Sequence, residues 1–439
     1  MLEQLTPIDY AARRRLVMER IGHEGIMVLY ANPERRRSND TFYRYRQSSD
    51  LLWLCGFPEP ECVIVLTPGA EHETTLFVRP RDRERETWDG YRAGPEGAVE
   101  RYGADQAFTI QELPVVLPKL MSGRVALYHA LGESQENDAQ ILAMIRGLKG
   151  NRRHGDRNPV AICDPTPILH RMRMRKDAAE IERMQVAADI SAAGHVAAMR
   201  ATTPGIREYN LEAVLTETFR SCGADGHAYE PIVAGGHRAC VLHYTENDAL
   251  LTDGDLVLID AGAELEGYAG DITRTWPVGG KFSGPQRVVY EAVLDAEEYA
   301  IGLTRVGATN VGVHEATTRR LVENMLSIGL LSGSVDSVIE RGIHREYFMH
   351  GTGHYLGLDV HDVGIYTERD GSPVLYQPGM VVTIEPGIYV RPDSDAPEIF
   401  RGIGVRIEDN VLIEENGPVV LTTAAPKSIS AIEAKVGAR

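Results

Sequence analysis

The sequence predicts two domains, a smaller α/β domain followed by a larger α+β domain. Three observations support this. A length of 439 residues is enough for two domains, each with its own core. Residues 150–167 are rich in Gly, Pro, Asn and Arg, a composition typical of a domain junction. On either side of that stretch, helical and strand patterns follow one another in different orders. We expect the domains to be 1–174 and 175–439.

The pattern of the first domain predicts strands alternating with helices. An amphipathic helix is expected at residues 10–21, where Leu16, Val17 and Ile21 share one side. Short apolar runs bounded by turn residues predict strands, and longer periodic runs predict further helices. The expected strands are 25–31, 51–57, 61–67, 73–79 and 124–130, and the further helices fall in 111–120 and 137–147.

The second domain begins with a long helical pattern over residues 176–201. Further helices are expected at 208–222, 286–304 and 311–328. The strands expected between and after them are 230–234, a hairpin within 256–275, then 380–384, 405–413 and 419–422. Runs of strands and helices in this order favour helices packed on an antiparallel sheet.

Charge and cysteine content limit the class of protein. A formal net charge of −17 disfavours nonspecific binding to nucleic acid or to anionic membranes. No apolar run approaches the ~20 residues of a membrane span, and the first residues lack a signal-peptide pattern. The five cysteines are scattered, odd in number and without a Cys-x-x-Cys pair, which predicts reduced thiols and a cytoplasmic location.

The hairpin expected within 256–275 carries an aspartate on each strand, Asp260 and Asp271. An apolar run ends on Asp260, a turn ending at Gly267 follows, and the next strand carries Asp271. If the hairpin folds about the Leu265–Glu266 bond, the two aspartates oppose each other with Cβ atoms roughly 4.5–5.5 Å apart. Bare carboxylates at that distance repel, so a divalent metal bound through oxygen is expected between them. Alternatively, one aspartate caps a turn and the other is solvated.

A histidine-rich loop lies further along the chain. His350, His354 and His361 fall within twelve residues that also contain three glycines. This spacing fits neither a helix face nor a strand, and it indicates a loop whose backbone approaches something closely. A single histidine is usually a packed or surface residue, but three with glycines point to a site.

Two further stretches carry acids on or at the end of expected strands. Glu385 ends one such strand and is followed by a Pro-Gly turn. Arg406 and Glu408 are two residues apart and therefore share a strand face. By itself that pair would be a surface salt bridge worth ~0–1 kcal/mol.

Counting charges relates these residues to metal chemistry. Asp260, Asp271, Glu385 and Glu408 bring four negative charges, and neutral His354 adds one nitrogen. Two divalent cations would neutralise the set, and sharing five side chains requires bridging carboxylates, with the cations roughly 3.5–4 Å apart. Such an oxygen-rich set favours Mn, Fe, Co or Mg. The zincin motif His-Glu-x-x-His and the phosphate-binding P-loop motif are both absent.

In order and context, these residues resemble the dinuclear metal site of the pita-bread metallopeptidases, which include methionine aminopeptidase, prolidase and Xaa-Pro aminopeptidase (aminopeptidase P). The five motifs are Leu-Ile-Asp-Ala-Gly, Gly-Asp-Ile-Thr-Arg-Thr, His-Gly-Thr-Gly-His, Thr-Ile-Glu-Pro-Gly and Val-Arg-Ile-Glu-Asp. Residues 43–50, followed by Gly56-Phe57, resemble the N-terminal domain of bacterial aminopeptidase P. The resemblance implies a C-terminal pita-bread (creatinase/aminopeptidase) fold with a smaller N-terminal α/β domain.

The resemblance also implies how the metals are bound. Asp271 and Glu408 would bridge two divalent ions, with Mn²⁺ expected first and Co²⁺ as an alternative. Asp260 would complete the shell of one ion. His354 and Glu385 would complete the shell of the other.

Roles around the metals are implied in the same way. His243, His350 and His361 would line the substrate cleft, and Tyr229 would contact the residue after the scissile bond. The resemblance further implies that Arg406 and Tyr389 orient Asp260 and its neighbours. The N-terminal domain would support a homodimer or homotetramer in which Trp88 lines a neighbouring subunit's cleft, unless Trp88 is a rim or core aromatic.

The implied reaction is release of the N-terminal residue from peptides with proline in second position. Hydroxide bridging the two metals would attack the carbonyl of the first residue. Glu385 would carry the proton to the proline nitrogen, and His361 or His243 would help to stabilise the oxyanion.

Alternatives remain open at this point. Prolidase uses the same ligands but cleaves only Xaa-Pro dipeptides. Methionine aminopeptidase is disfavoured by the N-terminal domain. A non-catalytic pita-bread scaffold and the creatinase-like hydrolases are disfavoured because all five ligands are present.

Overall fold

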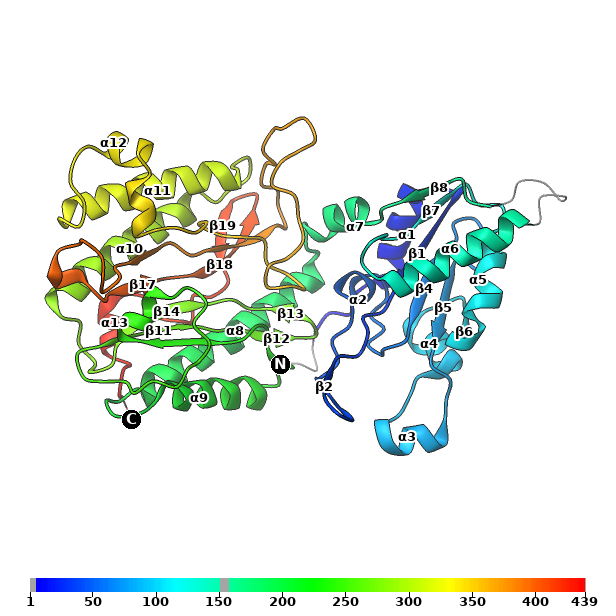
Figure 1. The fold of residues 1–439 in the computed structure, drawn as a ribbon, viewed down its shortest axis with the longest axis horizontal. Coiled ribbons are helices and arrows are strands. Elements are labelled where there is room, and N and C mark those ends of the chain that lie inside the picture. Colours follow the sequence, from blue (N-terminus) through cyan, green and yellow to red (C-terminus); the bar gives the residue numbers. More distant parts are fainter. Residues whose placement is uncertain (1–4, 151–157, 439) are drawn as a thin grey trace. The chain divides into compact units, whose positions relative to one another are not determined.

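The computed structural model describes residues 5–150 and 158–438, so part of the expected junction, 151–157, lies outside the described residues. Internal contacts divide the chain into two units (Figure 1). One unit is Ile8–Met172, and the other contains the chain from Arg173 onward together with the described residues before Ile8.

A mixed six-stranded sheet forms the centre of the first unit, with strand order β6-β5-β4-β1-β7-β8. Strand β4 pairs antiparallel with β1 and β5, and the remaining pairs are parallel. The strands are β1 (Gly25–Tyr30), β4 (Val63–Leu66), β5 (Thr74–Val78), β6 (Gln106–Thr109), β7 (Ala126–Tyr128) and β8 (Ala161–Cys163), with a separate hairpin of β2 (Arg36–Ser38) and β3 (Thr41–Phe42). The helices are α1 (Tyr10–Ile21), α2 (Ser49–Cys55), α3 (Arg83–Asp89), α4 (Gly94–Tyr102), α5 (Leu113–Met121), α6 (Gln135–Gly150) and α7 (Thr166–Arg173).

The expected strand at residues 51–57 is wrong, because this segment is helix α2. The helix ends at Gly56, which has a φ of +66° and donates its backbone N–H to the carbonyl of Leu52. Almost the whole helix is buried, so its apolar residues form one short continuous run. Such a run has no period that separates a buried helix from a buried strand.

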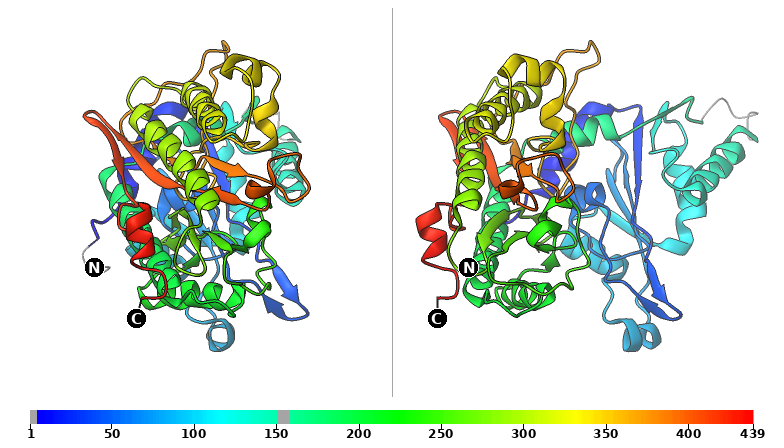
Figure 2. Two further views of the ribbon diagram at one scale, coloured as in Figure 1. Left: turned by 90° about the vertical axis from the view of Figure 1, so that its left-hand side faces the viewer. Right: turned by 60° about the vertical axis from the view of Figure 1, so that its left-hand side comes forward.

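The second unit contains short antiparallel sheets and two main pairs of helices. Helices α8 and α9 lie on one side of the strands, and α10 and α11 lie on the other (Figures 1 and 2). The helices are α8 (Ala178–Ala201), α9 (Glu208–Ser221), α10 (Gly284–Leu303), α11 (Asn310–Ser327), α12 (Val335–Glu340) and α13 (Ile429–Glu433). The expected α+β class is confirmed.

The strands of the second unit form four small sheets, ordered β10-β11-β14, β13-β12-β9, β15-β18-β19 and β16-β17. Their bounds are β9 (Gly226–His227), β10 (Ile232–Gly235), β11 (Leu256–Asp260), β12 (Ala263–Leu265), β13 (Tyr268–Ala269), β14 (Thr273–Pro277), β15 (Val381–Ile384), β16 (Gly387–Tyr389), β17 (Gly404–Arg406), β18 (Asp409–Glu414) and β19 (Gly417–Val420). An isolated bridge between Thr273 and Glu408 joins the sheet of β14 to the segment between β17 and β18.

The expected register of the hairpin within 256–275 is wrong by two residues. Asp260 pairs with Thr273 instead of Asp271. The turn is formed by Glu266 and Gly267, whose φ angles are +49° and +86°. Two successive positive φ angles give a hairpin turn that matches the strand twist, and centring it one bond later than expected moves every pair by two.

The expected strand at 405–413 is interrupted. Strand β17 ends at Arg406 and pairs with β16, whereas β18 begins at Asp409 and pairs with β15. The chain therefore changes sheets at Ile407 and Glu408, which leaves the Glu408 side chain between the two pairings. Within the described residues, no helix is both long and apolar enough to cross a membrane.

Candidate metal centre

Five separate segments of the second unit each bring one acid or histidine to a common centre. Asp260 ends β11, and Asp271 lies between β13 and β14. Glu385 directly follows β15, Glu408 directly precedes β18, and His354 lies in the loop before β15. Strand ends can hold side chains at fixed positions while leaving them outside the hydrogen-bonded ladder.

Three of these residues already have the arrangement of a metal site. Asp271, His354 and Glu408 each offer one ligand atom, and these atoms lie within 4.8 Å of one another. His354 Nε2 lies 3.5 Å from Asp271 Oδ2 and 3.5 Å from Glu385 Oε1. The histidine nitrogen thus faces two carboxylates, and such a mixture of oxygen and nitrogen donors suits divalent cations.

The two aspartates converge on one phenol despite the shifted register. Tyr229 Oη lies 2.6 Å from Asp260 Oδ1 and 2.5 Å from Asp271 Oδ1, so its single hydrogen lies between two carboxylates. Burial and the neighbouring aspartates raise the pKa of Tyr229 well above its ordinary value, so the phenol keeps its proton. The resemblance implies that Tyr229 contacts the residue after the scissile bond, and that role stays a prediction; in the structure, its hydroxyl lies between two of the expected ligands.

Arg406 holds Asp260 from behind. Its Nη2 donates to Asp260 Oδ2 at 2.6 Å, its Nη1 to Tyr389 Oη at 3.1 Å, and its Nε to Thr273 Oγ1 at 3.0 Å. Thr273 in turn donates to Glu408 Oε2 at 2.6 Å. One buried guanidinium therefore connects the supports of an aspartate and a glutamate, a geometry that its planar fork allows.

The acids are strongly perturbed by their surroundings. Burial raises the pKa of Glu385 to about 7, with the charge of Asp260 adding to the effect. Burial also raises the pKa of Asp271 and of Glu408 well above their ordinary values, and neighbouring carboxylates raise both further. Asp271, Glu385 and Glu408 together therefore favour a positive charge among them, so this donor set fits divalent metal ions.

The histidine-rich loop is bound to β15 by its backbone. Thr383 N donates to the His354 carbonyl at 2.9 Å, and Glu385 N donates to the Thr352 carbonyl at 2.8 Å. A Cβ atom on Gly353 would lie 1.8 Å from the Thr383 carbonyl oxygen, so only glycine permits this approach. The pairing places His354 beside Glu385.

Two of the other expected histidines, His350 and His361, lie beside this centre. The rings of His354 and His361 are 4.4 Å apart in a T-shaped arrangement. His350 contacts Tyr389 Oη through Nε2 at 2.8 Å and the Gly351 carbonyl through Nδ1 at 2.7 Å. Burial, together with the charge of Arg406, lowers the pKa of His350 to about 4, so the ring is neutral.

A buried ion cluster fixes the end of this loop. Asp362, the residue after His361, contacts Arg173 Nη2 at 2.7 Å through Oδ1 and Lys176 Nζ at 3.0 Å through Oδ2. Both cations are buried at the start of the second unit. They anchor the segment that carries His361.

Trp88 belongs to the other unit. It lies on α3 and is 83% exposed. Its role in lining a cleft therefore stays a prediction.

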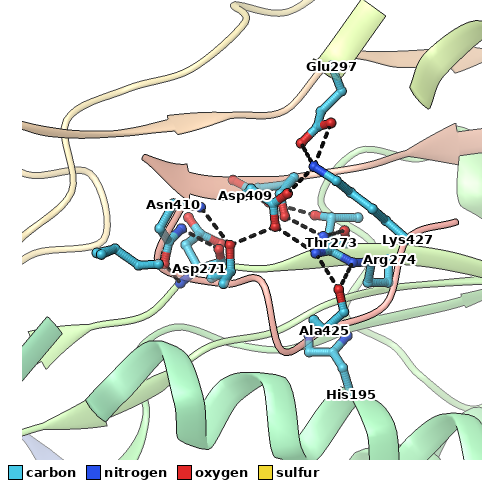
Figure 3. Close-up of polar contacts among 12 residues, drawn as sticks. His195, Asp271, Thr273, Arg274, Glu297, Asp409, Asn410, Ala425 and Lys427 are labelled. Carbon is cyan, nitrogen blue, oxygen red and sulfur yellow. Dashed lines mark hydrogen bonds and ion pairs between the residues drawn. The ribbon is translucent and has the colours of Figure 1, made fainter. Parts of the chain in front are cut away.

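The sequence did not point to several residues that support the acids. Asn410 accepts a hydrogen bond from Asp271 N at 3.1 Å and donates to the Asp271 carbonyl. Arg274 and Asp409 form a buried pair at 2.6 Å beside it (Figure 3). The available signal was the run of polar residues directly after Glu408, in a strand that is otherwise apolar.

Comparisons with known proteins agree with this geometry. The model of metallopeptidase family M24 matches residues 182–415, which carry all five expected ligands. The chain belongs to this metallopeptidase family. Its N-terminal part, residues 10–128, matches the model of the aminopeptidase P N-terminal domain.

Similar proteins span nearly the whole chain. The chain is 41% identical to the Xaa-Pro aminopeptidase of Escherichia coli over 435 residues, covering 99% of this chain and 98% of the relative. Among solved structures it resembles Pseudomonas aeruginosa aminopeptidase PepP, with a TM-score of 0.96, 45% identity and 98% of each chain covered. It also resembles a Zn-substituted E. coli aminopeptidase P in complex with product, with a TM-score of 0.95, 42% identity and 98% of each chain covered.

Proposed function

We propose that this protein is a metal-dependent aminopeptidase that releases the N-terminal residue from peptides with proline in second position. The observation that carries this proposal is the convergence of Asp260, Asp271, His354, Glu385 and Glu408 on one centre, in which Asp271 and Glu408 are buried. Membership of the M24 family and similarity to Xaa-Pro aminopeptidases over 98% or more of the chain support it.

The proposed cofactor is a pair of divalent cations, with Mn²⁺ expected first and Co²⁺ as the alternative. Asp271 and Glu408 would bridge the pair, Asp260 would hold one cation, and His354 with Glu385 would hold the other. Four carboxylates and one imidazole match the charge of two divalent ions and favour metals that prefer oxygen. When bound, the pair supplies a Lewis acid and lowers the pKa of a water molecule toward neutrality.

Glu385 is proposed to carry the proton during hydrolysis. Its carboxylate lies at the centre, 3.5 Å from His354 Nε2 and 3.8 Å from His350 Nδ1. As water oxygen bonds to the carbonyl carbon, Glu385 accepts the water's proton, and it gives the proton to the proline nitrogen as the C–N bond breaks. That nitrogen has no hydrogen of its own, so the leaving group requires a donor.

The exposed histidines are proposed to act on the substrate carbonyl. His243 and His361 are both exposed, and the ring of His361 lies 4.4 Å from that of His354. Either His243 or His361 can donate to the developing oxyanion. His350 has both ring nitrogens engaged, and it is better suited to forming a fixed wall for proline. His350 and Phe348 also line a cavity of about 960 Å³ whose other walls include residues of α11, and none of the five proposed ligands lines it.

The assembly is proposed to be a homodimer or homotetramer in the cytoplasm. The exposure of Trp88 is what a ring covered by another subunit would show in a single chain. Five free cysteines suit a reducing compartment. Tyr229 is proposed to contact the residue after the scissile bond.

Rates on Ala-Pro, Ala-Pro-Ala and Ala-Ala-Ala with manganese supplied test the proposal. Release of Ala from Ala-Pro-Ala, with little from Ala-Ala-Ala, supports the aminopeptidase. Activity confined to Ala-Pro would instead identify a prolidase. Absence of hydrolysis of all three, despite two bound Mn²⁺ per chain, would contradict a peptidase function.

A further inference from the structure

A chain of buried ion pairs lies behind the carboxylates of the centre. Lys427 Nζ contacts Glu297 at 2.8 and 2.9 Å and Asp409 Oδ2 at 2.6 Å. Asp409 Oδ1 in turn accepts from Arg274 Nη2 at 2.6 Å (Figure 3). Glu297, Asp409 and Arg274 have side chains at most 1% exposed, and Lys427 is only 23% exposed.

At one end of this series of ion pairs, Arg274 is hydrogen-bonded to the backbone of Glu408. Arg274 Nη1 donates to the Glu408 carbonyl at 2.6 Å and to the Thr273 carbonyl at 3.0 Å. Thr273 is also the residue whose hydroxyl donates to the Glu408 carboxylate. The orientation of the guanidinium therefore fixes both the backbone and, through Thr273, the side chain of Glu408.

Strand β18, which carries Asp409, also fixes the position of Asp271. Asp409 and Asn410 are consecutive in β18, and the Asn410 amide makes two hydrogen bonds to the backbone of Asp271. Thr422 Oγ1 contacts Asp409 Oδ1 at 2.6 Å and accepts from Asn410 N at 3.1 Å. A shift of Asp409 would therefore move Asn410 and loosen both acids.

Lys427 comes from a different part of the chain and touches none of the five proposed ligands in the contacts described. It lies after β19, near the C-terminus, and Glu297 lies on α10. Buried ion pairs usually stabilise a fold no more than apolar residues would, so such a chain calls for a role in geometry. Among the contacts of the described residues, Lys427 reaches the centre through Asp409.

We propose that Lys427 is a positioning residue that acts through Asp409 and Arg274 to hold the two bridging carboxylates, Asp271 and Glu408, at the spacing the metal pair requires. This inference rests on the proposed function, because it concerns the ligands of that metal centre. Residues that support metal ligands from behind typically change metal affinity roughly 10–100-fold when they are lost.

The test is a calorimetric titration of manganese into chelator-treated protein. Thermal unfolding of the metal-free protein is measured in parallel. The double variant Lys427→Met, Glu297→Gln removes the cation and its outer carboxylate together. We expect manganese affinity roughly 10–100-fold weaker, a metal-free Tm close to that of the unaltered protein, and an unchanged KM for Ala-Pro-Ala. Excess manganese should restore kcat.

Tyr290→Phe is the matched control. Tyr290 Oη donates to the Lys427 carbonyl at 2.6 Å, so this variant removes a hydrogen bond from the same segment and leaves the ion pairs intact. Its manganese affinity should stay at the unaltered value. Equal weakening in Tyr290→Phe and in the double variant would overturn the proposal, because the effect would then follow from the segment's stability.

The remaining outcomes are also decisive. A double variant that binds manganese as tightly as the unaltered protein sinks the inference. If the unaltered protein binds no manganese, the proposed function fails instead. If the double variant does not fold, Asp409→Asn replaces it, because this variant keeps the side chain's shape and removes the charge between Lys427 and Arg274. It is expected to show the same weakening of manganese affinity. Unchanged affinity in Asp409→Asn would overturn the inference.

Discussion

Tyr229 donates its phenolic hydrogen to Asp260, with 2.6 Å between Tyr229 Oη and Asp260 Oδ1. The same oxygen contacts Asp271, so the phenol competes with cations for two proposed ligands. Because a hydrogen bond contributes about 0.5–1.5 kcal/mol net, Tyr229→Phe should bind manganese up to about tenfold more tightly. Calorimetric titration checks this. Tyr355→Phe, which loses a hydrogen bond to the Ile365 carbonyl, is the control, and weaker binding by Tyr229→Phe would contradict the expectation.

Arg406 contacts three side chains, and lysine cannot replace it. A single ammonium lacks the fork that reaches Asp260, Tyr389 and Thr273 together. In Arg406→Lys we expect kcat to fall roughly 10–100-fold with little change in KM, because ligand orientation is lost while the substrate cleft remains. Arg401→Lys is the control, since Arg401 contacts only the Ala396 carbonyl in the described contacts. A large rise in KM would show instead that Arg406 binds substrate.

Two glycines of the histidine-rich loop should respond differently to alanine. A Cβ on Gly353 would lie 1.8 Å from the Thr383 carbonyl oxygen, whereas a Cβ on Gly351 would have nothing closer than 4.0 Å. Overpacking of this kind typically costs about 1–3 kcal/mol. The Tm and the activity should both fall in Gly353→Ala and remain near the unaltered values in Gly351→Ala. Equal behaviour of the two variants would mean that the loop does not pair with β15 as described.

His195 should make the fold sensitive to acid. It is fully buried and donates through Nε2 to the Ala261 carbonyl at 3.0 Å, and burial lowers its pKa from 6.5 to about 4. The unfolded chain therefore binds a proton between pH 6.5 and 4 that the folded chain does not, and stability falls as the pH falls through this window.

The measurement for His195 compares denaturant unfolding at pH 7 and pH 4. A pKa difference of this size corresponds to a loss of about 3 kcal/mol at most. His195→Gln keeps an amide donor for the carbonyl and has no titrating group, so its loss over the same range should be smaller by that amount. Parallel losses in both proteins would exclude His195 as the cause.

Removing metal should abolish activity and lower stability. Chelation leaves four acids together, and burial and mutual repulsion raise the pKa of Asp271, Glu385 and Glu408. Adding manganese at one hundred times its Kd should raise the free energy of unfolding by about 2.7 kcal/mol per site. Calcium at equal concentration is the control for ionic strength. Activity that survives exhaustive chelation would contradict a metal-dependent mechanism.

The five proposed ligands could be selected from the sequence because each ends an apolar run or lies in a glycine-rich loop, both of which are local signals. The register of the hairpin could not be predicted, because Glu266 and Gly267 both adopt positive φ and only Gly267 is a residue type that favours it. Residues 51–57 were assigned to a strand because a short buried helix leaves no period in sequence.

The supports of the ligands were harder to predict than the ligands. Arg406 was expected to orient Asp260 through the family resemblance, and the distance of 2.6 Å agrees with that role. The contact of Lys427 with Asp409 joins segments whose pairing depends on how β18 and β19 meet, and nothing in either local sequence specifies it.

The position of Lys427 has a consequence for biosynthesis. All five proposed ligands precede it in the chain, so a ribosome has already made them before the lysine that faces Asp409 exists. A nascent polypeptide at that stage carries the acids without the lysine that pairs with Asp409 behind them. High-affinity cofactor loading would therefore follow synthesis of Lys427, so a protein cut short just before Lys427 should capture manganese poorly although every proposed ligand is present.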